Sequence, residues 1–393
     1  ECVIMAFECS DKVISSRVCE YNSEEICAVF LRHFAELGID KSTFDGKKTV
    51  IKPNLVMKKS PEYAATIAPQ VLDGLLSALD SFGCKPTIAE SPGGVYSTAR
   101  LEGIYRVCGI TDVAEKHGAV LNTDTTWKRM SYEGGRLVKS FNIITPVAEA
   151  DIIIDLCKLK THSLTVMSGA VKNLFGTIPG IEKFEAHAAY PEYGDFAAML
   201  CDLCLMLCES KNVIAVTDAV IGMEGSGPTA GTPREFGFIS TSQNPFASDL
   251  LSARVLGFDE KVTTVAESIK RGLCPEKAEG LILCGDPVPG VENVKPAEGS
   301  GGSMKALKFF SRGKIGRFFM PRPVIDTSAC RGCGDCVRSC PQKTITLEKT
   351  QSGAKAKINA SNCIRCYCCQ ELCPFLAVKI KRNFITETIS KIK

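Results

Sequence analysis

The chain has 393 residues, of which 45% are hydrophobic and 23% charged, and its formal net charge is +3. This length predicts more than one domain, and the hydrophobic fraction is enough for a substantial core. The nearly balanced charge excludes a general bias toward nucleic acid. Without a long apolar run or a signal peptide, no stable membrane insertion is expected.

The N-terminal part alternates strand and helix patterns. Residues 2–7 are expected to form a strand, residues 23–38 a helix, and residues 48–56 a β-branched strand. The last of these segments brings Lys52 and Asn54 to the carboxyl end of a buried strand.

The next segments repeat this order, with a helix expected over residues 68–82 and a strand within residues 85–94. Alternating strands and helices predict an α/β fold whose mostly parallel sheet is covered by helices. Ligands of such sheets bind beyond the carboxyl ends of the strands, where Glu90 and Ser91 would also lie. The Ser-Pro-Gly-Gly sequence that starts at Ser91 can also be only a turn.

Residues 103–118 predict another helix, and residues 120–125 and 136–146 predict further strand material. The strongest apolar run, around Ile152, Ile153 and Ile154, predicts a buried strand.

A group of polar residues follows this strand: Lys158, Lys160, Thr161 and His162 in an expected loop, then Lys172 and Asn173 where a helix would begin. Three lysines and a histidine at a strand exit indicate an anion site. The alternative is that the lysines are solvated and that His162 is only hydrogen-bonded.

His187 is a second candidate histidine, and residues 195–210 predict a helix. Cys201, Cys204 and Cys208 recur there at spacings of three and four, which is typical of a core stripe and not of a third cluster.

Residues 212–234 predict a strand followed by a loop with Gly222, Gly225, Gly227 and Gly231. Such a loop lets backbone N–H groups approach an anion, although it fits neither the Walker pattern nor G-x-G-x-x-G.

Residues 301–322 combine basic and aromatic side chains. We interpret this segment as a linker that docks on the large domain, with contact to a membrane surface as the alternative.

Two runs near the C-terminus have the same spacing, C-x2-C-x2-C-x3-C-P. This is the pattern of bacterial ferredoxins with two [4Fe-4S] clusters, in which the fourth cysteine of each run binds the other cluster. The first cluster is therefore assigned to Cys330, Cys333, Cys336 and Cys373, and the second to Cys363, Cys366, Cys369 and Cys340.

Zinc and disulfides are the alternatives for these cysteines. Zinc sites usually pair C-x2-C with a distant second pair, which the triple spacing does not resemble, and Pro341 and Pro374 fit the cluster pattern. Cys368 lies between two ligands and is interpreted as a surplus thiol.

The residues around the cysteines also repeat, at an offset of 33 residues (330 to 363). This repeat predicts a small α+β ferredoxin-like domain with quasi-twofold symmetry. We therefore expect three parts: an α/β ligand-binding domain over 1–300, the linker over 301–322 and the ferredoxin domain over 323–384.

The segments IKPNLV, DLCKLKTH, SGAVKNLFGTIPG and VIGMEGSGPTAGTP together resemble the iron–sulfur family called domain of unknown function 362, over about residues 1–290. The resemblance implies an α/β domain that binds a small ligand, coupled to two [4Fe-4S] clusters, with no established reaction. The resemblance also implies that the matching positions belong to the ligand site: Lys52, Asn54, Lys158, Lys160, His162, Lys172, Asn173, Glu224 and Gly225.

These features predict an iron–sulfur oxidoreductase that passes low-potential electrons from a redox partner protein to a small anionic substrate or cofactor. Lys160 would hold a carboxylate or phosphate, His162 would supply a proton, and Glu224 would orient the ligand or act as the acid. We assign binding roles to Lys52, Asn54, Lys158, Lys172, Asn173 and Gly225.

A non-catalytic electron carrier or assembly factor, whose large domain binds a partner protein, is the main alternative. Redox sensing and a purely structural ferredoxin unit are two others. The chain carries no flavin or nicotinamide fingerprint. Reduced cysteines outside the motifs indicate the cytoplasm, and oxygen-sensitive clusters indicate an anaerobe.

Overall fold

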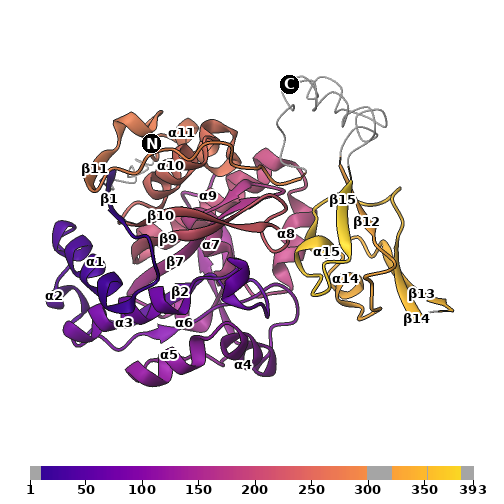
Figure 1. The fold of residues 1–393 in the computed structure, drawn as a ribbon, viewed down its shortest axis with the longest axis horizontal. Coiled ribbons are helices and arrows are strands. Elements are labelled where there is room, and N and C mark those ends of the chain that lie inside the picture. The colour runs from indigo at the N-terminus through magenta and orange to yellow at the C-terminus, as the bar shows by residue number, and fades with distance from the viewer. Residues whose placement is uncertain (1–9, 299–320, 352, 382–393) are drawn as a thin grey trace.

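The computed structural model describes residues 10–298, 321–351 and 353–381, which form a large α/β unit and a smaller C-terminal unit (Figure 1). The strand expected over residues 2–7 and the linker residues 301–320 lie outside the described residues.

The large unit is built on a nine-stranded sheet. In spatial order its strands are β11 (Ile282–Gly285), β1 (Lys12–Arg17), β10 (Thr232–Ser242), β9 (Asn212–Glu224), β7 (Ile152–His162), β2 (Thr49–Pro53), β3 (Thr87–Ile88) and β4 (Val120–Leu121), with β8 (Val166–Ser168) paired to the end of β7. The strands from β9 to β4 are parallel, whereas β10 and β8 run antiparallel to their neighbours. The predicted α/β class with a mostly parallel sheet is therefore confirmed.

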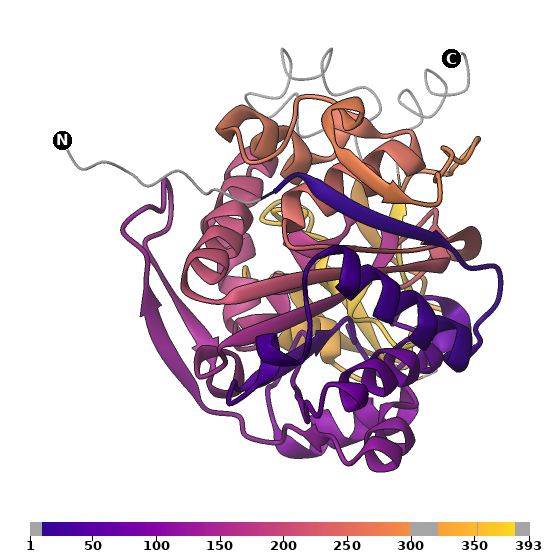
Figure 2. The same cartoon turned by 90° about the vertical axis from the view of Figure 1, so that its left-hand side faces the viewer.

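Helices cover both faces of this sheet, as Figures 1 and 2 show from two directions. They are α1 (Ser23–Glu36), α2 (Lys41–Phe44), α3 (Pro69–Ser81), α4 (Thr98–Val107), α5 (Ile110–His117), α6 (Thr145–Ala148), α7 (Ala170–Asn173), α8 (Glu182–Ala189), α9 (Tyr193–Ser210), α10 (Pro245–Leu256) and α11 (Thr263–Arg271). Short 3-10 turns lie at Pro61–Tyr63, Leu174–Thr177, Asp259–Lys261 and Ala278–Gly280.

Side chains of β7 alternate between two cores because successive strand residues point to opposite faces. Ile152 and Ile154 pack with α1 and α3, whereas Ile153 packs with α9 and α10. Cys201 and Cys204 of α9 are fully buried in the second core, as their helical spacing predicted.

Two sequence predictions need correction. The single helix expected over residues 103–118 is two helices, because Gly109 adopts a left-handed φ of 71° between them. The strand material at 136–146 does not join the main sheet: β6 (Ser140–Ile144) pairs with β5 (Trp127–Ser131) in a separate hairpin.

The C-terminal unit has the predicted internal repeat. Strand β12 (Arg322–Ile325) pairs with β15 (Val378–Lys381), and β13 (Ile345–Thr350) pairs with β14 (Gly353–Ile358). Helices α14 (Asp335–Arg338) and α15 (Cys368–Glu371) occupy equivalent places in the two halves.

None of the helices in the described ranges is long and apolar enough to cross a membrane.

Candidate functional site

Strand β7 is longer than its sequence suggests. Residues Lys158 to His162 were expected in a loop, but they continue the strand, where β8 pairs antiparallel with them and β9 parallel. Strands β8 and β9 provide hydrogen-bond partners for the backbone of this segment. Its polar side chains therefore lie inside the protein. Lys158, Lys160 and His162 are at most 2% exposed, which excludes the solvated alternative for these two lysines.

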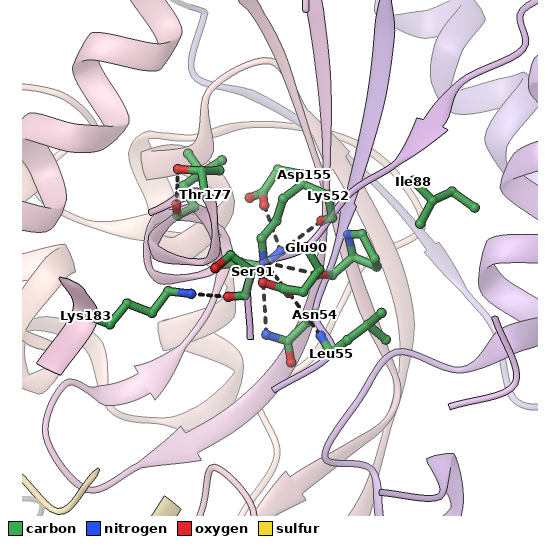
Figure 3. Close-up of polar contacts among 12 residues, drawn as sticks. Lys52, Asn54, Leu55, Ile88, Glu90, Ser91, Asp155, Thr177 and Lys183 are labelled. Atoms are coloured by element: carbon green, nitrogen blue, oxygen red, sulfur yellow. Dashed lines mark hydrogen bonds and ion pairs between the residues drawn. The ribbon is translucent and has the colours of Figure 1, made fainter. Parts of the chain in front are cut away.

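A hydrogen-bonded network links β2 to β7 beyond the sheet edge (Figure 3). The Lys52 Nζ atom lies 2.8 Å from Glu90 Oε2 and donates to Asn173 Oδ1 at 2.7 Å. Asn54 continues the chain: its Nδ2 donates to Asn173 at 2.9 Å, and its Oδ1 accepts from Lys160 Nζ at 2.6 Å. Four predicted residues therefore meet in one network, with Glu90 as their carboxylate.

Asn173 ties this network to the sheet interior. Its Nδ2 donates to Asp155 Oδ1 at 2.8 Å and to the Lys52 carbonyl at 3.2 Å. Burial raises the pKa of Asp155 well above its ordinary value, and the cationic Lys52 opposes this shift.

Lys158 belongs to a different cluster. Its Nζ lies 2.8 Å from Asp218 Oδ2 and 2.8 Å from the Tyr21 hydroxyl. Asp218 also accepts from the Ala68 backbone N–H at 2.9 Å. The charge of Lys158 is thus matched by the internal Asp218 carboxylate, and the Tyr21 hydroxyl lies within hydrogen-bond distance of its ammonium.

Lys160 has no such carboxylate, because its ammonium donates to Asn54 and to the Ala65 carbonyl at 2.6 Å. Burial lowers its pKa well below the ordinary lysine value, and the nearby charges of Lys172, Lys158 and Lys52 lower it further. Burial also lowers the pKa of Lys172, and the Glu371 carboxylate opposes that shift. Lys160 and Lys172 are the two cations of the site whose charge is least compensated.

His162 is held in one neutral tautomer. Its Nδ1 accepts from the backbone N–H groups of Leu164 at 3.0 Å and Thr165 at 3.3 Å, so the remaining proton lies on Nε2. Burial, with Lys172 nearby, lowers the pKa of His162 to about 4. The ring is therefore a neutral hydrogen-bond donor at pH 7.

His187, the second candidate, packs between aromatic rings. It stacks on Phe196 with ring centroids 4.4 Å apart and meets Phe175 edge-on at 5.8 Å. Burial lowers the pKa of His187 to about 3. This environment is that of a core histidine close to the site.

Glu224 and Gly225 lie where β9 ends. The Glu224 carboxylate accepts from the Lys295 backbone N–H at 3.1 Å and lies 3.8 Å from its ammonium. Gly225 accepts at its carbonyl from the Thr161 hydroxyl at 2.9 Å, and its φ is 77°. The recorded contacts of Glu224 thus join it to the segment after β11, while Gly225 borders β7.

The C-terminal unit reaches this site through α15. Glu371 Oε1 lies 3.1 Å from His162 Nε2. The Glu371 carbonyl accepts from the Thr229 hydroxyl at 3.0 Å, and Gln370 donates to the Ser226 carbonyl at 3.3 Å. Burial would raise the pKa of Glu371, but His162 and Lys172 hold it near 2.

An apolar contact supports the same junction. Leu372 and Cys368 pack against Phe184 of α8, and Cys368 is also close enough to affect the pKa of Lys172. The surplus thiol of the second cysteine run is therefore buried at the boundary between the two units.

The motif cysteines line two small hollows. One is lined by Cys330, Cys333, Cys336 and Cys373, and the other by Cys340, Cys363, Cys366 and Cys369. In each set the fourth thiol comes from the other run.

The donor chemistry fits iron–sulfur clusters. Four motif cysteines border each hollow, and Cys368 also lines the second one. Backbone N–H groups point at three of the motif sulfurs: Ala356 at Cys330 (3.4 Å), Thr344 at Cys340 (3.3 Å) and Ala377 at Cys373 (3.2 Å). Such bonds to ligand sulfurs tune cluster potentials. All cysteines in the described residues are free of disulfides.

Sequence reasoning missed two of the charged residues at this site. Glu371 lies between the motif cysteines Cys369 and Cys373, and it was missed because only the cysteines of the motif were considered. Lys183, whose ammonium donates to the Ser91 carbonyl, is buried, which lowers its pKa to about 7. An acidic residue inside a cysteine motif was the available signal for Glu371.

Comparisons with known proteins identify both units. A family model described as Domain of unknown function (DUF362) matches residues 49–254, and one described as 4Fe-4S dicluster domain matches residues 322–374. A thylakoid-associated protein of Synechocystis sp. is 30% identical over 240 residues, which cover 60% of this chain and 71% of that protein. An uncharacterized ferredoxin of Methanocaldococcus jannaschii is 35% identical over 60 residues, covering 14% of this chain and 90% of that protein.

Two solved structures overlap the chain in part. The lactate racemase apoprotein from Thermoanaerobacterium thermosaccharolyticum aligns with a TM-score of 0.38 and 14% identity, over 63% of this chain and 57% of that one. A protein from Thermotoga maritima aligns with a TM-score of 0.38 and 13% identity, over 60% of this chain and 59% of that one. The chain thus spans less than two thirds of either structure, and nothing about its reaction follows from them.

Proposed function

Because the chain belongs to the family called domain of unknown function 362 and carries a 4Fe-4S ferredoxin-like domain, we propose that it is an iron–sulfur oxidoreductase. In this proposal two [4Fe-4S] clusters pass low-potential electrons to a small anionic substrate or cofactor beside Lys160, Lys172 and His162. A reduced redox partner protein supplies the electrons. The reducing surroundings that such clusters need favour a cytoplasmic location.

One observation carries the proposal: α15 belongs to both sites. It holds Cys369, a proposed ligand of the second cluster, and two residues later Glu371 contacts His162 of the large unit. Cys340, Cys363, Cys366 and Cys369 would hold a cluster on the side of this unit that carries α15. Bound clusters of this type supply one-electron transfer.

The two sets differ in their neighbours, which suggests a direction for the electrons. Cys333 of the first set is exposed, whereas Cys366 of the second set packs with Phe184 of the large unit. We propose that the partner protein docks near Cys333 and that the second set faces the substrate.

In this proposal Lys160, Lys172 and His162 have different roles in binding and proton supply. Lys160 and Lys172 offer positive charge without a carboxylate of their own in the large unit. His162 presents its Nε2–H as a hydrogen-bond donor that orients the ligand. Lys172 is the better source of the accompanying proton, since a lysine with a lowered pKa is a stronger acid.

Lys52, Asn54 and Asn173 position Lys160 through the hydrogen bonds of the network. We retain Lys158 and Gly225 as wall residues of the site and Glu224 as a candidate acid at its edge. These roles remain predictions for mutagenesis.

The alternative, an electron carrier or assembly factor, also has an observation in its favour. Lys52 and Lys158 already have the internal carboxylates Glu90 and Asp218, so part of the positive charge is structural. In that case the lysines stabilise the domain interior, and the ferredoxin unit exchanges electrons only with other proteins.

An anaerobic experiment separates these functions. The purified protein would be reduced by a low-potential donor, and pooled metabolites would be screened for reoxidation of the clusters. We expect one metabolite class to reoxidise the wild type but not Lys160→Met, while the exposed control Lys261→Met behaves like the wild type. Equal reoxidation of the wild type and Lys160→Met, or none by any metabolite together with rapid exchange with another redox protein, would favour the carrier.

A further inference from the structure

The contact between Glu371 and His162 is short, but its geometry does not meet that of a hydrogen bond. The two atoms are 3.1 Å apart, yet His162 Nε2 and Glu371 Oε1 both lack an aligned hydrogen-bond partner among the described residues. Buried donors and acceptors are normally paired, and an unpaired one costs free energy. The Glu371 carboxylate therefore occupies the site without accepting an aligned hydrogen bond from His162 Nε2.

The charges around this carboxylate come from the large unit. His162 of β7 lies 3.1 Å from this carboxylate, and the charges of Lys172 and Lys160 lie close enough to interact with it. Lys160 has only neutral oxygen acceptors, Asn54 Oδ1 and the Ala65 carbonyl. The site thus contains a histidine donor in contact with a single carboxylate from another domain, and two lysines that interact with its charge.

Glu371 is also where this group meets solvent. Its side chain keeps 14% of its surface exposed, whereas that of His162 keeps none. The docking of α15 does not depend on the carboxylate, because the Glu371 carbonyl binds Thr229 and Leu372 packs on Phe184. The contacts that hold α15 therefore do not require the Glu371 carboxylate to stay at His162.

From this geometry we infer that Lys160, Lys172 and His162 form a binding site for the carboxylate of a small organic acid, and that Glu371 fills it until the ligand displaces it. This inference rests on the proposed function, for which it names the substrate class. The internal carboxylate shows which chemistry fits, and its misalignment makes it replaceable by a free carboxylate that can align with the His162 Nε2–H.

The test is an equilibrium titration of the full-length, cluster-loaded protein with sodium acetate under anaerobic conditions. We expect Glu371→Gln to bind acetate at least about tenfold more tightly than the wild type, because the internal competitor is gone. Lys172→Met in the Glu371→Gln background should remove the gain. The matched control Glu348→Gln alters an exposed carboxylate of the same unit and should leave acetate binding unchanged.

Iron content and circular dichroism would establish that each variant is folded, and Glu371→Ala repeats the test if Glu371→Gln is not. Unchanged acetate affinity in a folded Glu371 variant would overturn the inference. A gain for inorganic phosphate without one for acetate would overturn the carboxylate class.

Acetate binding requires no electron transfer, so this result is independent of the reoxidation assay. If Glu371→Gln binds acetate more tightly and no metabolite reoxidises the clusters, the reductase proposal is wrong and the carboxylate site is supported. Lysine-dependent reoxidation with unchanged acetate affinity would do the reverse.

Discussion

The two halves of the ferredoxin unit have the same backbone but different surroundings. Positions 332, 334 and 343 have φ values of 65°, 80° and 49°, and their counterparts 33 residues later, 365, 367 and 376, have 61°, 62° and 51°. The first half uses Gly332 and Gly334 at two of these left-handed positions, whereas the second half uses Arg365 and Tyr367. A non-glycine residue in this conformation costs about 1–2 kcal/mol.

The second half offsets this cost through contacts that the first half does not make. Tyr367 is 1% exposed, and its hydroxyl donates to the Pro321 carbonyl at 3.0 Å. The helices differ in the same way. Arg338 pairs with Asp335 at the surface, while its counterpart Glu371 enters the large unit. At this position one half of the duplicated unit enters an internal interface, whereas the other half has a surface ion pair.

Removing a cluster ligand should have the largest effect and distinguish the halves most clearly. Cys333→Ala and Cys369→Ala are each expected to lose about half of the bound iron, because each removes one of four thiols from one set. Only Cys369→Ala should also loosen the contact with the large unit, since Glu371 and Leu372 follow it directly.

Iron and sulfide analysis, with small-angle X-ray scattering of the same samples, would check this difference. Equal expansion of both variants would mean that the halves contribute alike to docking.

The apolar contact at Leu372 should come next. Its counterpart in the first half is Ser339, so Leu372→Ser places in the second half the residue that the first half has at the equivalent position. We expect a loss of about 3 kcal/mol in the free energy of unfolding, because the packing on Phe184 is lost. Urea titration would measure it, and Ser339→Ala is the control, with an expected loss of about 1 kcal/mol.

Acidification should lower the stability of the folded protein through protonation of His162, which lies where the second half meets the large unit. Its pKa is about 4 in the folded protein and 6.5 when unperturbed. Between these values the unfolded chain binds a proton that the folded chain does not, so stability is complete above pH 6.5 and falls as the pH drops toward 4. The loss is on the order of 3 kcal/mol.

Thermal unfolding at a series of pH values would follow this loss, and His162→Gln should flatten the profile. An unchanged profile in that variant would assign the acid sensitivity to other groups, such as His187 and His33, whose pKa values burial also lowers.

The smallest effects are expected at the left-handed positions. Gly332→Ala should destabilise the unit by about 1–3 kcal/mol, because an added Cβ would lie 2.3 Å from the Ala354 carbonyl oxygen. Arg365→Gly should change stability by less than about 1 kcal/mol, since relief of backbone strain is opposed by a more flexible unfolded chain. Urea titrations of both variants would show whether the halves tolerate glycine exchange asymmetrically.

Local patterns in the sequence were enough to identify the elements of the fold. Apolar spacing gave α1 and α3 nearly to the residue, because amphipathic helices must bury one face. The cysteine spacing and its 33-residue repeat indicated the duplicated ferredoxin unit, since loops of this length set which thiols can share a cluster. Of the predicted residues, Lys52, Lys160, Asn54 and Asn173 met beyond the sheet edge, where parallel strands place their carboxyl ends.

Only the tertiary structure decided what those side chains contact. Lys158 to His162 form strand and not loop because β8 and β9 satisfy their backbone, which depends on segments distant in sequence. The partners Asp218 and Glu371 lie 60 and 209 residues from Lys158 and His162 (218 − 158 and 371 − 162), so no local pattern relates them. Charge compensation in a buried site is a property of three-dimensional packing, and local periodicity carries no record of it.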